Sequence, residues 1–129
     1  MFLTKNMEKW LDYSFDPVEN RTGKDFNNFS RNLKTEMKAQ LKGYNCEIIQ
    51  YSKGYFYISG FIRSNLTGEI VYFSIPDLRY EKMWYEHILI RKAKDIKDFQ
   101  GGINHWTKLD QFGFSVQKMF NHQQNQVAA

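Results

Sequence analysis

The apolar residues of this 129-residue chain change their spacing at Gly43, and this change constrains the fold more than any other feature of the sequence. Before Gly43, large apolar residues recur every three or four positions, as one buried helical stripe requires. They are Phe26, Phe29, Leu33, Met37 and Leu41. After Gly43 come short runs rich in β-branched and aromatic residues, which are typical of strands. A helical segment followed by a strand segment predicts an α+β fold.

Four runs of this kind predict an antiparallel sheet of four strands. They span residues 46–51, 55–63, 69–75 and 84–91. The connections between the first three runs are short and suit hairpins, so we expect these strands to form a meander. Both faces of the second and third strands carry apolar side chains. We therefore expect helices on one face, and a partner or a covering terminal segment on the other.

Three helices are predicted to pack on this sheet, two before it and one after it. They span residues 4–15, the segment between Thr22 and Gly43, and residues 107–120. Thr107, with Asp110 three residues later, resembles the capping pair at the start of a helix. Residues 92–106 are predicted to form a loop. The chain is expected to be a single α+β domain over residues 1–120, with a polar, flexible tail over residues 121–129.

The cysteine content and the first residues indicate the cytoplasm as the compartment. Cys46 is the only cysteine, so no internal disulfide can form, and residues 1–5 lack the apolar run of a signal peptide. No stretch approaches the ~18 consecutive apolar residues of a membrane-spanning helix. We therefore expect no membrane partner, and the sequence does not determine the oligomeric state.

Catalytic and metal-binding patterns are weak, so we predict a protein that is not an enzyme and needs neither a cofactor nor a metal. Structural zinc sites pair their ligands about two to five residues apart, but the soft ligands here are scattered. They are Cys46, His87, His105 and His122. The Gly-x-Ser-x-Gly signature of a nucleophilic serine is absent, and the pair Gly101-Gly102 lacks the Gly-Lys-Ser/Thr of a phosphate-binding loop.

One enzymatic alternative stays open, a magnesium nuclease of the PD-(D/E)xK type. Such enzymes place Pro-Asp near one strand and an acidic-x-Lys group on the next, so that two carboxylates hold the metal and the lysine orients water. Pro76-Asp77 and Asp95-Ile96-Lys97 match this pattern. Glu36-Met37-Lys38 passes the same test inside a predicted helix, so the pattern arises easily by chance.

Basic residues form two clusters in a chain whose net charge is +4. The first is a stripe on the predicted long helix, made of Arg31, Lys34, Lys38 and Lys42. The second mixes cations with aromatic rings and contains Arg79, Tyr80, Lys82, Trp84, Tyr85, Arg91, Lys92, Lys94 and Lys97. Such mixtures suit phosphate contacts and base stacking, although nearby acidic residues dilute the field. A nucleic-acid-binding module is therefore the first alternative, and ordinary surface charge explains the same residues without it.

Two segments resemble a group of small proteins from plasmids and phages of Firmicutes. In residues 88–106 the likeness is carried by Arg91, Asp98, Gly101, Gly102, Asn104 and Trp106. Residues 72–79, which read Tyr-Phe-Ser-Ile-Pro-Asp-Leu-Arg, are similar to the same group. Some of these proteins resemble anti-CRISPR inhibitors, which block a type II RNA-guided nuclease. The resemblance implies a non-enzymatic inhibitor from a mobile genetic element, with a protein or ribonucleoprotein partner that it occludes sterically.

The binding residues predicted for such a surface come from both basic clusters and from the resembling segment. They are Arg31, Lys34, Lys38, Arg79, Tyr80, Lys82, Trp84, Arg91, Lys92, Lys94, Lys97, Asn104 and Trp106. The basic charge argues against mimicry of DNA, which needs an acidic surface. A structural role explains part of the same segment, because a glycine pair permits a tight turn whose backbone Asp98 and Asn104 can bond.

Overall fold

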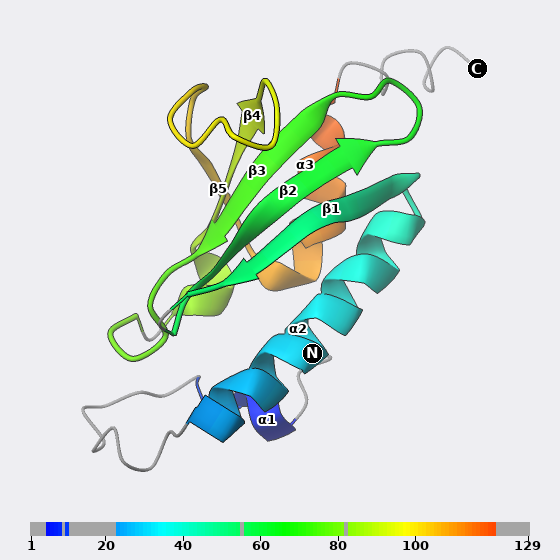
Figure 1. The fold of residues 1–129 in the computed structure, drawn as a ribbon. Helices are drawn as coiled ribbons and strands as arrows, with labels where there is room; N and C mark the ends of the chain where they lie inside the picture. Colours follow the sequence, from blue (N-terminus) through cyan, green and yellow to red (C-terminus); the bar gives the residue numbers. More distant parts are fainter. Residues whose placement is uncertain (1–4, 9, 11–22, 55, 82, 121–129) are drawn as a thin grey trace.

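The computed structural model describes residues 5–8, 10, 23–54, 56–81 and 83–120, which form an α+β fold (Figure 1). The helices are α1 (Lys5–Glu8), α2 (Gly23–Lys42) and α3 (Phe112–Lys118), with 3-10 turns η2 (Trp84–Glu86) and η3 (Leu109–Gln111). The strands are β1 (Cys46–Lys53), β2 (Ile58–Ser64), β3 (Ile70–Ile75), β4 (Ile88–Ala93) and β5 (His105–Thr107). They pair antiparallel in the order β1-β2-β3-β4-β5. The predicted meander is thus confirmed.

The prediction of four strands is wrong, because the segment expected to be a loop contains β5. This strand has three residues, of which His105 and Trp106 are exposed, so no apolar alternation marked it. Its pairing with β4 takes Thr107 out of the predicted cap of the last helix, which begins at Phe112 after η3. The fourth strand begins at Ile88 rather than at residue 84, because Trp84–Glu86 form a 3-10 turn.

The long helix α2 buries the stripe that the sequence predicted. Phe26, Phe29, Leu33, Met37 and Leu41 are all buried in one core with the inner side chains of the sheet. Met7 and Trp10 belong to the same core. Lys5–Glu8 is helical within the predicted first helix, and residues 4, 9 and 11–15 lie outside the described residues, as do Thr22 and the predicted tail.

Helix α3 packs on the same face of the sheet, next to α2. The Phe112 ring meets the Phe73 ring edge to face at 5.8 Å between centroids. Gln40 joins the two helical segments, because its Oε1 accepts a bond from Gly113 N at 2.7 Å and its Nε2 donates to the Leu109 carbonyl at 2.9 Å. The predicted C-terminal helix on the sheet is therefore confirmed, in a shorter form.

The loop between β4 and β5 covers part of the opposite, far face of the sheet. Its Phe99 ring lies 5.3 Å from Phe61 and 5.9 Å from Tyr72, between centroids. Phe61 is fully buried as a result. The second apolar face was expected to bind a partner or a terminal segment, whereas the structure places an internal loop over it (yellow in Figure 1).

Among the described residues, none of the helices combines the length and the apolar character needed to cross a membrane.

Candidate binding surface

Of the two basic clusters predicted from the sequence, the structure keeps one together and separates the residues of the other. The stripe on α2 stays together, because its four side chains line two hollows between α2 and the edge strand β1. Figure 1 shows α2 beside this strand. The second cluster is divided between the core, the β4–β5 loop and another part of the surface. The candidate surface therefore begins with α2.

Two hollows lie between α2 and β1, and we call them together the basic groove. The first, of about 370 Å³, is lined by Asn27, Ser30, Arg31, Lys34, Tyr51 and Lys53. The second, of about 420 Å³, is lined by Lys38, Lys42, Asn45, Cys46, Glu47, Ile48 and Asn65. Arg31 and Lys42 are eleven residues apart on the helix, which is about 16 Å along its axis. The groove thus presents a row of cations.

Tyr51 shapes the first hollow from the strand side. Its hydroxyl lies 2.9 Å from Ser30 Oγ and donates to the Ser30 carbonyl at 3.1 Å. The Lys34 ammonium lies 4.9 Å from the centre of the Tyr51 ring, a distance at which a cation is attracted by the ring face. Burial raises the pKa of Tyr51 to about 12, so the phenol is neutral. Lys53 Nζ donates to Asn27 Oδ1 at 2.8 Å across the hollow.

The lining of the two hollows contains little acidic charge. Among the residues lining the two hollows, Glu47 alone is acidic, and it forms an ion pair with Arg63. Glu36 accepts a bond from Gln40, on the flank of α2 that faces α3. The two hollows are therefore lined by five basic residues and by one carboxylate, which is already paired with Arg63. The basic groove has the positive potential that attracts an anionic partner.

The edge of the sheet adds backbone groups to this surface. β1 is paired on one side only, with β2. In an antiparallel ladder, hydrogen-bonded residue pairs alternate with pairs that are not hydrogen-bonded. Gly54 N donates to the Tyr57 carbonyl, so Gly54 and Tyr57 form a hydrogen-bonded pair, and every second pair along β1 and β2 is of the same kind. Tyr51 and Lys53 fall in non-bonded pairs with β2, so their N–H and C=O groups point to the outer edge. Backbone donors thus run along the basic groove.

Several predicted binding residues of the second cluster have structural roles instead. Trp84 is fully buried and its Nε1 donates to the Trp10 carbonyl at 3.0 Å. Arg79 forms an ion pair with Asp77 at 2.7 Å and lies over the Phe56 ring at 4.6 Å. The prediction that Trp84 contacts a partner at the surface is wrong. Aromatic residues that are neighbours in the sequence can be either buried or exposed, so their spacing does not distinguish core from surface.

The remaining residues of that cluster are spread over the surface. Tyr80, Lys94, Lys97 and Asn104 are exposed, and Lys82 lies outside the described residues. Lys94 and Lys97 sit in the β4–β5 loop beside Asp95 and Asp98, which reduce the local positive charge. Lys92 and Trp106 line a separate groove next to α3. The structure does not bring these residues into one site.

Arg91 holds the β4–β5 loop on the sheet. Its guanidinium lies 4.5 Å from the centre of the Tyr72 ring, and its Nη2 donates to the Asp98 carbonyl at 2.7 Å. The Asp98 carboxylate in turn accepts backbone bonds from Lys94, Gly101 and Gln100. Gly102 has a φ of +81° and its Cα packs against the Lys92 carbonyl, where a side chain has no space. Four of the residues that carry the resemblance therefore build this loop, namely Arg91, Asp98, Gly101 and Gly102.

Acid is expected to weaken the β4–β5 loop through Asp98. The backbone bond from Lys94 first, then that from Gly101, lowers the pKa of Asp98 below its ordinary value of 3.8. A carboxyl group whose pKa is lower in the folded protein than in the unfolded chain stabilises the folded state at pH values above the unfolded-state pKa. This stabilisation is lost as the pH falls through the folded-state pKa. We predict that Asp98→Asn unfolds at lower urea than the parent at neutral pH, and that the difference shrinks in strong acid. A constant difference across the titration would contradict a role for the charge.

The structure separates the two carboxylates of the PD-(D/E)xK pattern, Asp77 and Asp95. β3 and β4 run antiparallel, with Ile70 opposite Ala93 and Ser74 opposite Leu89. Asp77 follows one end of β3 whereas Asp95 follows the β4 end that lies beside Ile70, so about 20 Å of strand separates them. The two carboxylates therefore do not meet around one ion. No group of three or more metal-binding side chains occurs within the described part of the chain.

Cys46 also lacks the features of a nucleophile. Only 4% of it is exposed, and burial raises the pKa of its thiol to about 11. A thiol with this pKa is protonated at neutral pH and is a poor nucleophile.

Sequence reasoning missed Lys53, Tyr51 and Asn27, which complete the basic groove. Lys53 was assigned to a turn, although it is the last residue of β1. Its place beside the first turns of α2 depends on how the strand lies against the helix, and spacing along the chain carries no signal for that.

Comparisons with known proteins give no relative. No protein-family model matches the chain, and neither the curated proteins nor the solved structures contain a match.

Proposed function

We propose that this chain is a non-enzymatic binding protein that uses the basic groove to dock on an anionic macromolecular target. The observation that carries the proposal is the row of Arg31, Lys34, Lys38, Lys42 and Lys53, which faces a single paired carboxylate. Cations in such a row contribute mainly to the steering and orientation of an anionic partner.

The target that we propose is the ribonucleoprotein of an RNA-guided nuclease, as in the anti-CRISPR inhibitors that the group from Firmicutes plasmids and phages resembles. Its guide RNA supplies phosphates, and these fit a row of cations flanked by backbone donors. Docking on the nuclease or on its guide would keep target DNA out by steric occlusion. The positive groove is consistent with contact to RNA rather than with imitation of it.

A titration of DNA cleavage tests this proposal. A type II nuclease loaded with guide RNA is mixed with increasing amounts of the protein, and cleavage of a matched target is followed. We expect inhibition that is complete near equimolar protein, because occlusion is stoichiometric and not catalytic. Unchanged cleavage at large excess, together with no binding of the loaded nuclease, would remove this target.

The same groove supports a second candidate, a module that binds nucleic acid by itself. Binding of the isolated guide RNA and of DNA is measured by fluorescence anisotropy over a range of salt. A nucleic-acid module binds the naked strands, with an affinity that falls steeply as salt rises. An inhibitor directed at the ribonucleoprotein binds the loaded nuclease much more tightly than either strand. The ratio of these affinities separates the two candidates.

Charge reversal on α2 tests whether the basic groove is the contact. For Lys34→Glu with Lys38→Glu we expect the affinity for the anionic target to fall by about tenfold or more, and the salt slope to fall by roughly 0.7–0.9 for each phosphate contact that is lost. The control is Lys94→Glu with Lys97→Glu, which makes the same charge change in a loop that already contains Asp95 and Asp98. Equal losses in both variants would mean that only net charge matters.

A further inference from the structure

The first hollow of the basic groove holds two of its lysines in place. Lys34 Nζ lies 4.9 Å from the centre of the Tyr51 ring, and Lys53 Nζ donates to Asn27 Oδ1 at 2.8 Å. Tyr51 and Asn27 line the same hollow as the lysines that they contact. Both ammonium groups are therefore kept at the wall of one hollow.

The groups that hold these two lysines carry no charge. Asn27 presents an amide oxygen, and burial raises the pKa of Tyr51 to about 12, so the phenol stays protonated at neutral pH. Elsewhere in the described part of the chain, three arginines are held by carboxylates. These pairs are Arg63–Glu47, Arg79–Asp77 and Arg91–Asp98. A carboxylate offsets the charge of the cation that it holds, whereas an amide or a ring leaves that charge in full.

The same hollow contains a third cation. Asn27, Arg31 and Lys34 follow each other at spacings of four and three, so they lie on one flank of α2 over about 10 Å. Tyr51 and Lys53 come from the end of β1 on the other side of the hollow. None of the lining residues is acidic. Three positive charges therefore line a hollow of about 370 Å³, which has room for a phosphate group.

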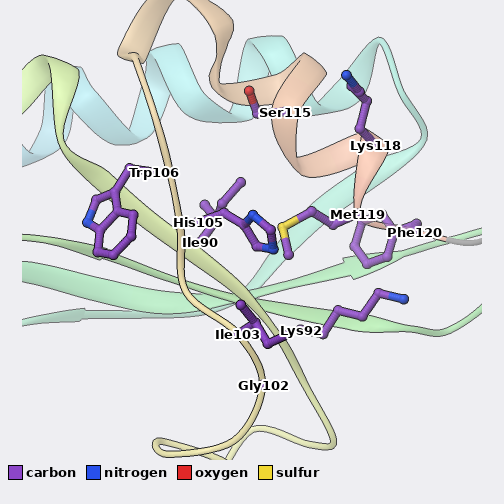
Figure 2. A pocket seen from close by; sticks show the side chains of 10 residues that line it. All are labelled: Ile90, Lys92, Gly102, Ile103, His105, Trp106, Ser115, Lys118, Met119 and Phe120. Atoms are coloured by element: carbon purple, nitrogen blue, oxygen red, sulfur yellow. The ribbon is translucent and has the colours of Figure 1, made fainter.

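Two other hollows lack this arrangement. In the second hollow of the basic groove, the two lysines share the lining with Glu47. A larger hollow, of about 680 Å³, lies next to α3 and is lined by Lys92 and Lys118 (Figure 2). Their amino groups point apart there, and the Lys118 ammonium lies over the ring of Phe114, which is outside the lining. Of the three hollows, the first alone combines several cations with neutral holding groups.

We infer that the first hollow is the phosphate-binding site of the basic groove, where Arg31, Lys34 and Lys53 hold one phosphodiester group of the guide RNA. This inference rests on the proposed function and adds Tyr51 and Asn27 to it as positioning residues. A cation that is already in place loses less side-chain freedom when the phosphate binds. Its charge then contributes fully to the charge-assisted hydrogen bonds with the phosphate oxygens.

The probe for this site is 2′-O-methyl tetrauridylate, and its control is the same oligonucleotide with uncharged methylphosphonate linkages. Titration of each into ¹⁵N-labelled full-length protein, followed by amide chemical shifts, gives both the affinity and the location. We expect the charged probe to shift the amides of residues 27–34 and 51–53, and to bind at least about tenfold more tightly than its control. Absence of saturable shifts with the charged probe overturns the inference, as does equal binding of the two.

Asn27→Asp tests the neutrality of a holding group. The new carboxylate can still accept the bond from Lys53, so the variant should resist urea at least as well as the parent. We expect its affinity for the charged probe to fall by about fivefold, the effect of one added charge about 4 Å away in water. Asn104→Asp makes the same charge change at an exposed residue outside the basic groove, and should change the affinity by less than about twofold. Equal losses in the two variants mean that only net charge matters, and the inference is then wrong.

Two variants of Tyr51 test the ring. Tyr51→Phe keeps the ring face next to Lys34 but loses the bonds to Ser30, so it should be less stable and bind the charged probe almost as well as the parent. Tyr51→Leu removes the ring, and the affinity should fall by about two- to fivefold, the range for an exposed cation–π contact. The Lys34 side-chain protons should also lose their ring-current shift in the free Tyr51→Leu protein, and not in Tyr51→Phe. If affinity follows stability in both variants, Tyr51 has no positioning role.

Failure of this inference is distinguishable from failure of the proposed function. If Lys34→Glu with Lys38→Glu weakens binding of the loaded nuclease while Asn27→Asp does no more than Asn104→Asp, the basic groove is the contact and the first hollow is not its phosphate site. If the loaded nuclease does not bind at all, the proposed target is wrong. Saturable shifts of residues 27–34 and 51–53 would still locate the phosphate site in the first hollow.

Discussion

Trp84→Ala is expected to lower the free energy of unfolding by about 3–5 kcal/mol, the range for removal of a buried tryptophan. Trp84 is fully buried, and its ring meets Phe29 edge to face at 4.9 Å between centroids. The change also removes the donor of the bond to the Trp10 carbonyl, 74 positions away in the chain. Since small domains are stable by only about 5–15 kcal/mol, the loss is a large fraction of the total.

The matched control is Trp106→Ala, because this tryptophan is 62% exposed. An exposed substitution of this kind changes stability by about 0.5 kcal/mol or less. Urea unfolding followed by circular dichroism gives both values, and Trp84→Phe should fall between them because it keeps an aromatic ring. If Trp106→Ala costs as much as Trp84→Ala, the assignment of one tryptophan to the core and the other to the surface is wrong.

The contrast between these two tryptophans shows what could be predicted from the sequence. The stripe of α2 was predictable, because five large apolar residues at helical spacing can be buried together in only one way. The strand runs were predictable for a similar reason. Residues 80–85 gave no such pattern: Tyr80 is 72% exposed whereas Trp84 is completely buried. Trp84 begins the turn η2 and packs against Phe29 of α2, which is remote in sequence.

The candidate surface was predictable only on its helical side. Arg31, Lys34 and Lys38 recur on one flank of a helix, and a helix keeps that flank together whatever the tertiary structure. Lys53 and Tyr51 join them because β1 becomes the edge strand next to α2, which depends on the strand order. For the separate groove next to α3, the sequence singled out Lys92 and Trp106 but gave no sign that β4, β5 and α3 bring them together.

Arg91 illustrates the opposite error, in which a structural cation was assigned to a binding surface. In sequence it stands next to Lys92 and near Lys94, as part of a basic run. Its side chain is only 4% exposed, because the loop that follows β4 folds back over it. The ring of Tyr72 and the backbone of Asp98 provide its contacts. A charged residue becomes buried only where partners of this kind exist, and they come from β3 and from seven residues downstream.

Arg91→Ala is therefore expected to destabilise the fold by roughly 2–3 kcal/mol, the scale of hydrogen bonds to a charged group together with lost packing. In this variant the Asp98 carboxylate still accepts its backbone hydrogen bonds. The loss of stability is therefore smaller than for a buried charge that is left without any partner. Arg63→Ala is the control, since Arg63 pairs with Glu47 at the surface, with side chains 45% and 50% exposed. Exposed pairs of this kind contribute about 0–1 kcal/mol.

Hydrogen exchange locates the Arg91 effect and distinguishes it from a general loss of stability. In Arg91→Ala, the amides of residues 94–104 should exchange faster than in the parent protein. The exchange rates of the α2 amides should rise only as much as the loss of global stability requires. Arg91→Met keeps a long apolar stem over Tyr72 but cannot donate to the Asp98 carbonyl, so we expect it to recover part of the stability and little of the loop protection. Full protection of residues 94–104 in Arg91→Ala would mean that the stacking of Phe99 on Phe61 and Tyr72 holds the loop without the arginine.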